Sequence, residues 1–100
     1  MEPKIQFARE SLEKLCRKWR VRELALFGSV LREDFKPQSD IDVLISFEAD
    51  APWSLWDLVD LQEELGRLFG RPVDIVEPEG LRNPWRRREI LNTRQIVYAA

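Results

Sequence analysis

The chain has 100 residues and a formal net charge of −2, which suits one hydrophobic core, so we expect a single domain over residues 1–100. It has no histidine and one cysteine, Cys16, which excludes histidine bases, imidazole zinc sites and a disulfide-stapled scaffold. The slightly acidic charge argues against direct nucleic-acid binding, and the lack of a long apolar stretch or signal-peptide pattern predicts a cytoplasmic protein without membrane contact.

The first third of the chain predicts a helix followed by a short strand. Apolar residues recur at helical spacing over residues 4–19, which predicts an amphipathic helix with Cys16 on its buried stripe as a small core residue. The apolar run at residues 24–27 predicts a strand that ends at Gly28 and Ser29.

A second strand is predicted to begin at Asp40 and to run to residue 47. Strict alternation places four apolar residues on one face: Ile41, Val43, Ile45 and Phe47. Asp40 and Asp42 therefore point to the opposite face.

The second half continues as helix, strand, helix and strand. Ser54 and Asp57 have the spacing of a capping box, which predicts a helix over residues 54–69 that ends at Gly70. Further elements are predicted in chain order: a strand at 72–76 containing Asp74, a helix at 84–91 capped by Asn83, and a strand at 95–98. The order predicts an α+β fold of two layers, with a mixed β-sheet, helices packed on one face and the carboxylate face open.

Three aspartates and a glycine-serine pair form the one pattern that suggests chemistry. Asp40 and Asp42 share a strand face, and Asp74 on another strand completes an oxygen-only donor set of the kind that Mg²⁺ or Mn²⁺ prefers. Gly28 permits close approach of the backbone, and Ser29 offers a hydroxyl and an N–H to a phosphate. The alternative is a solvated carboxylate face, but like charges this close cost stability unless a cation or proton intervenes.

These residues resemble a known family. Gly28-Ser29, ten residues, Asp40-x-Asp42 and the later Asp74 are similar to the signature of the DNA polymerase β-like nucleotidyltransferases, and more narrowly of the minimal nucleotidyltransferases. The resemblance covers nearly the whole chain and implies the two-layer nucleotidyltransferase fold. It also implies Mg²⁺-dependent transfer of AMP from ATP to an acceptor hydroxyl, with pyrophosphate leaving.

By this resemblance, the catalytic and metal-binding residues are Asp40, Asp42 and Asp74, which hold two Mg²⁺ ions. Gly28, Ser29 and Arg32 hold the phosphates of ATP. The resemblance further implies an antitoxin whose partner is a HEPN-domain toxin, with a tyrosine hydroxyl of that toxin as the acceptor, in a homo- or hetero-oligomer.

Other functions stay open at this point. A binding module that neutralises its partner by occlusion would use aromatic and arginine anchors, and the chain offers Trp53, Trp56, Trp85 and the arginines at 86–88. A nucleotidyltransferase acting on a small molecule is a further alternative. Tyr98, in an apolar terminal strand, is interpreted as a packing residue.

Overall fold

The computed structural model describes residues 7–31 and 40–100. Its elements follow the predicted order: α1 (Arg9–Lys18), β1 (Val21–Phe27), the 3₁₀ turn η1 (Gly28–Leu31), β2 (Ile41–Phe47), α2 (Leu55–Phe69), β3 (Val73–Val76), the 3₁₀ turn η2 (Pro78–Gly80), α3 (Pro84–Thr93) and β4 (Gln95–Ala99). The larger differences from the predicted bounds are that β1 begins earlier, at Val21, and that α3 runs on to Thr93. Residues 4–6 of the predicted first helix lie outside the described part.

The four strands form one mixed sheet in the order β3-β2-β1-β4. β1 is antiparallel to β2 and to β4, while β2 and β3 are parallel. A parallel neighbour requires a crossover connection, and α2 supplies it between β2 and β3. The predicted mixed sheet is therefore confirmed.

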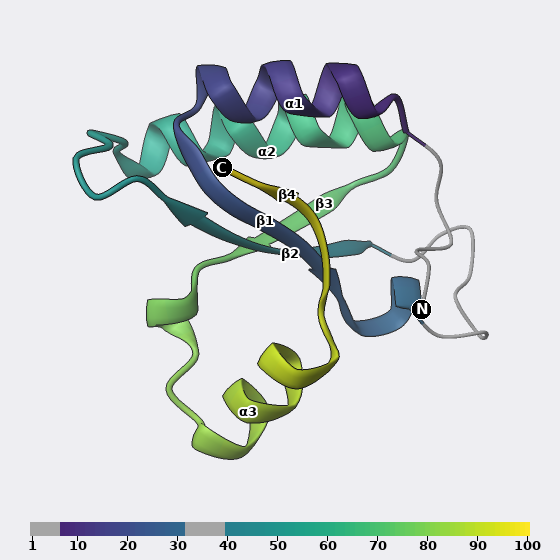
Figure 1. Ribbon diagram of the computed structural model, residues 1–100, viewed down its shortest axis with the longest axis vertical. Coiled ribbons are helices and arrows are strands. Elements are labelled where there is room, and N and C mark those ends of the chain that lie inside the picture. The colour runs from purple at the N-terminus through teal and green to yellow at the C-terminus, as the bar shows by residue number, and fades with distance from the viewer. Residues whose placement is uncertain (1–6, 32–39) are drawn as a thin grey trace.

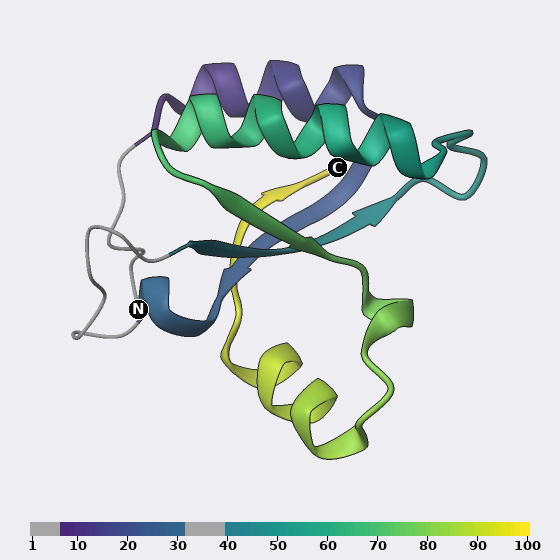
Figure 2. The same cartoon turned by 180° about the vertical axis from the view of Figure 1, so that it is seen from behind.

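α1 and α2 lie side by side across one face of the sheet, as both views of the ribbon show (Figures 1 and 2). Their apolar stripes meet the inward residues of the strands in the main core. This core includes Leu12, Cys16, Leu24, Leu26, Ile41, Val43, Ile45, Leu61, Leu65, Phe69, Val73 and Val97, with Tyr98 packed against it. The predicted α+β fold, with α1 and α2 packed on one face of the sheet, is confirmed, and Tyr98 is a packing residue.

α3 lies at one end of the opposite face, where the sequence predicts an open surface. Alternate residues of β1 and β2 form an apolar patch there, and Leu81 and Ile90 cover it in a second, smaller core with Ala25, Phe27 and Leu44. Ile90 is the only buried residue among the ten of α3. α3 therefore covers only part of this face, and the aspartates lie beside the covered part.

The predicted caps of α2 and of the start of α3 are confirmed. Ser54 and Asp57 exchange the hydrogen bonds of a capping box at the start of α2, and Gly70 ends that helix in the left-handed conformation. Asn83 accepts hydrogen bonds from the backbone N–H groups of Trp85 and Arg86, which fixes where α3 begins. In the described stretches at 7–31 and 40–100, each helix is too short or too polar to cross a bilayer.

Candidate active site

Strand pairing brings two of the three predicted aspartates together. Asp42 on β2 is the register partner of Asp74 on β3, across the parallel pair. Register partners of adjacent strands project to the same face, here the face on which α3 packs. Asp42 is half-buried and Asp74 is exposed, whereas Asp40 is exposed directly before β2.

Gly28 lies against the carboxylate of Asp42. Phe27 is the register partner of Asp42 on the other side, so β1 ends beside it and the chain turns into η1. Gly28 has φ +75°, and a Cβ at this position would lie 2.5 Å from Asp42 Oδ2. A side chain at residue 28 would therefore strain the backbone and push the Asp42 carboxylate aside, which explains the glycine.

The phosphate-binding prediction is only partly covered by the structure. Ser29 lies in η1 directly after Gly28, but the position of its side chain is outside what the structure describes. Arg32 falls between the described stretches. The contacts predicted for these two side chains stay predictions.

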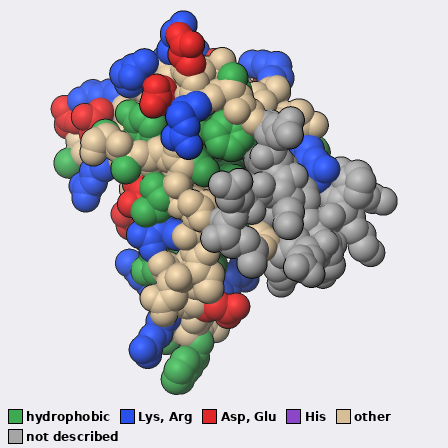
Figure 3. All heavy atoms as spheres, turned by 45° about the vertical axis from the view of Figure 1, so that its right-hand side comes forward, with side chains coloured by type: hydrophobic (Ala, Val, Ile, Leu, Met, Phe, Trp, Pro, Cys, Tyr) green, Lys and Arg blue, Asp and Glu red, His purple; other side chains and the backbone are tan. Residues whose placement is uncertain are grey.

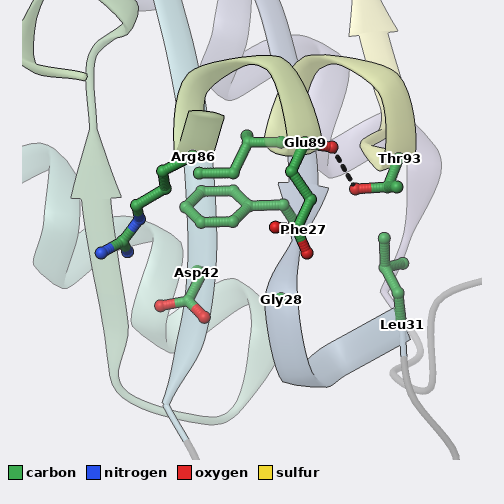
Figure 4. A pocket seen from close by; sticks show the side chains of 8 residues that line it. Phe27, Gly28, Leu31, Asp42, Arg86, Glu89 and Thr93 are labelled. Carbon is green, nitrogen blue, oxygen red and sulfur yellow. Dashed lines mark hydrogen bonds between the residues drawn. The ribbon is translucent and has the colours of Figure 1, made fainter. Parts of the chain in front are cut away.

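A cavity of about 700 Å³ opens between the end of the sheet and α3. Figure 4 shows its walls: Asp42 and Gly28 on the sheet side, and Arg86, Glu89 and Thr93 from α3. Phe27, Leu31 and Ile90 add apolar surface. An apolar lining with few convergent polar groups is typical of a small-molecule site, and this volume is large enough for one.

The sequence pattern did not predict the contribution of α3 to this cavity. It suggested an interface role for Arg86 and no role for Glu89 or Thr93. The cap at Asn83 predicts the helix, but no local signal tells which sheet face it packs on. Thr93 Oγ1 donates a hydrogen bond to the backbone carbonyl of Glu89 at 2.7 Å, one turn earlier in α3, and both residues line the cavity.

The three predicted aspartates do not form one compact donor group. In residues 7–31 and 40–100, no three acidic, cysteine or histidine side chains gather closely enough to hold a metal ion together. Asp42 and Asp74 nevertheless fit a divalent cation by donor type and by register, since Mg²⁺ takes carboxylate oxygens and the two side chains lie on one face of adjacent strands. The metal-binding roles of the three aspartates stay predictions.

Comparison with known proteins places this geometry among nucleotide-transferring folds. The family model described as "Nucleotidyltransferase domain" matches residues 8–97. A protein of Thermococcus cleftensis named protein adenylyltransferase MntA is 38% identical over 71 residues, which are 71% of this chain and 70% of that protein.

Solved structures agree on the fold. A structure assigned as a minimal nucleotidyltransferase superposes with a TM-score of 0.69 at 35% identity, and the match covers 86% of this chain and 85% of the other. A toxin-antitoxin crystal structure with AMP-PNP superposes with a TM-score of 0.70 at 19% identity, covering 92% and 73% of the two chains. The second likeness, at this identity, concerns the fold alone.

Proposed function

This chain belongs to the nucleotidyltransferase domain family and is a nucleotidyltransferase, and on that premise we propose that it transfers AMP from ATP to a hydroxyl of a partner protein. The observation that carries the proposal is the register of Asp42 with Asp74, beside Gly28 and at the wall of the cavity. The name of the Thermococcus relative supports a protein as acceptor, and the AMP-PNP in the related structure supports an adenine nucleotide as donor.

Asp42 and Asp74 are the proposed Mg²⁺ ligands, with Asp40 as a third carboxylate. Bound Mg²⁺ would supply neutralisation of the triphosphate and of the charge that develops on the attacking and leaving oxygens. The carboxylates themselves repel phosphate oxygens, so they would hold the α-phosphate at the edge of the sheet only with Mg²⁺ bound, next to the open face where an acceptor arrives.

The transfer is an in-line displacement at the α-phosphorus. The acceptor oxygen forms a bond to this phosphorus while the bond to the pyrophosphate oxygen breaks. Asp74, which is exposed, is the proposed base for the hydroxyl proton. Gly28 and Ser29, with Arg32, are proposed to hold the distal phosphates, since backbone N–H groups and a guanidinium both suit phosphate oxygens.

The partner is proposed to be a toxin, with this chain as the antitoxin in a cytoplasmic complex. The related structures titled as MntA with its toxin partner HepT support this pairing. A HEPN-domain toxin modified on a tyrosine hydroxyl is the most specific form of the proposal. The oligomeric state, homo- or hetero-oligomeric, stays a prediction.

The test uses ATP labelled on the α-phosphate or on the γ-phosphate, with Mg²⁺ and the co-purified partner. We expect α-label on the partner and no γ-label, and loss of transfer in Asp42→Asn. Asp60→Asn, an exposed aspartate on α2, is the matched control that keeps transfer. Undiminished transfer in Asp42→Asn would contradict the site.

A second readout is independent of transfer. Mg²⁺ is expected to raise the melting temperature of the wild-type chain by binding the folded state through Asp42 and Asp74, and to have no such effect on Asp42→Asn. A stable complex that shows no transfer would favour the occlusion module instead. Trp56 and Trp85, each 79% exposed, are the observation that favours this second function.

A further inference from the structure

A second cavity adjoins the proposed nucleotide cavity. It has a volume of about 420 Å³ and is lined by the end of β3, by η2 and by the start of α3. Arg86 lines both cavities. An occupant of the second cavity would therefore lie next to the nucleotide, separated from it by one guanidinium.

The wall of this second cavity is positively charged. Arg82 and Asn83 line it together with Arg86. In the described part of the chain, neither Arg82 nor Arg86 makes an ion pair. Arg87, in contrast, is committed to the fold, because its guanidinium donates to the carbonyl of Pro78 at 2.9 Å.

The charges near the N-terminus of α3 have the opposite sign to those that stabilise a helix there. The first turn holds no acidic residue, and Arg86, Arg87 and Arg88 stand in the N-terminal half, where the helix dipole favours negative charge. The stability of α3 gains nothing from this arrangement. A negatively charged occupant would offset it.

Trp85 adds an apolar anchor at the same place. It is exposed over 79% of its surface at the second position of α3. Exposed tryptophan and arginine are the residue types that contribute most to protein interfaces. Figure 3 shows basic (blue) and hydrophobic (green) side chains together at the lower tip of the molecule, where Figure 1 places α3.

We propose that Trp85, Arg82 and Arg86, with the adjoining cavity, form a docking surface for an acidic segment of the acceptor protein; this rests on the proposed function. The distribution of charge favours an acidic segment as the occupant. The chain as a whole carries a net charge of −2, and residues 37–66 contain no lysine or arginine, so an acidic partner meets attraction at α3 rather than over α2. Arg86 lines both the docking cavity and the nucleotide cavity, so a segment bound in the docking cavity lies next to the nucleotide.

The test measures binding of a labelled peptide with a central tyrosine between runs of glutamate, by fluorescence anisotropy with the full chain. A matched peptide with lysine in place of glutamate and a labelled oligoadenylate are the comparisons. We expect the glutamate peptide to bind, the lysine peptide not to bind, and the affinity to fall as salt is raised.

Variants locate the surface. Arg82→Glu and Trp85→Ala are each expected to weaken peptide binding about tenfold. Arg9→Glu, an exposed arginine at the start of α1 on the far side of the sheet, is the control and should change binding less than about twofold. Arg82→Lys, which keeps the charge, should retain most of the binding. The altered side chains are exposed, so the variants are expected to fold.

Two results of the binding assay would overturn the docking surface: equal binding of the glutamate and lysine peptides, or tighter binding of the oligoadenylate that Arg82→Glu also weakens. The assay needs no transfer, so it separates the docking surface from the proposed enzyme activity. If Arg82→Glu loses peptide binding but the wild-type chain shows no adenylyl transfer, the docking surface stands and the proposed enzyme activity is refuted. If adenylyl transfer to the partner proceeds equally well in Arg82→Glu and Trp85→Ala, the enzyme activity stands and the docking surface is refuted.

Discussion

Replacing Gly28 with alanine tests the contact between the turn and the carboxylate. At φ +75° an alanine costs about 1 kcal/mol in backbone strain. Its Cβ would lie 2.5 Å from Asp42 Oδ2, so the carboxylate must rotate, at about 1 kcal/mol more. Gly28→Ala is therefore expected to lower the free energy of unfolding by about 2 kcal/mol in total.

Gly70→Ala is the matched control. Gly70 has nearly the same φ, +73°, but nothing lies within 4 Å of the position that a Cβ would occupy. It shares the strain of about 1 kcal/mol without the clash. The difference between the two variants isolates the contact with Asp42, and urea unfolding measures it.

Adenylyl transfer should separate the two variants more sharply than stability does. A displacement of a catalytic group by about 1 Å costs about a hundredfold in rate, so Gly28→Ala should lose about that much while Gly70→Ala keeps the wild-type rate. The initial rate of α-label transfer, at a temperature where both variants are folded, gives the comparison. If Gly28→Ala matched Gly70→Ala in both rate and stability, the proposed contact would be wrong.

Two further predictions concern the packed helices. Lys18 hydrogen-bonds the Glu64 carboxylate at 2.6 Å and holds its pKa below the ordinary value of 4.5, with help from the indole N–H of Trp19. Because the pKa of Glu64 is lowered, its ion pair stabilises the fold above pH 4.5, and this stabilisation is lost as the pH falls through the folded-state pKa. The free energies of unfolding of wild type and Glu64→Gln should therefore converge at low pH. A difference between the two that stays constant with pH would contradict this. Burial, with the nearby charge of Glu13, raises the pKa of Cys16 to about 12. A thiol reagent at about pH 8, near the pKa of a free thiol, should therefore modify Cys16 only as fast as the chain opens, and modification of the native chain at the rate of a free thiol would contradict this.

Local signals in the sequence predicted most of the secondary structure. Three of these signals involve residues only a few positions apart: the capping box at Ser54, the left-handed glycine at 70 and the cap at Asn83. Because the interactions are local, the sequence predicts them without knowledge of the fold. Alternation in β2 placed Asp42 on the face opposite to the main core for the same reason. The start of β1 at Val21 was not predicted, since pairing with β2 and β4, rather than propensity, extends that strand.

The amino-acid sequence alone shows which reactive groups the chain has: carboxylates at strand spacing, a glycine at the preceding strand end, and no histidine or cysteine pair to compete as ligands. The folded chain shows which of these groups meet. The parallel register places Asp42 beside Asp74, and the packing of α3 through Ile90 forms a cavity with Arg86 on its wall where an open face was expected. Register and helix docking depend on burying apolar surface between segments far apart in the chain, and a pattern within one segment does not carry that information.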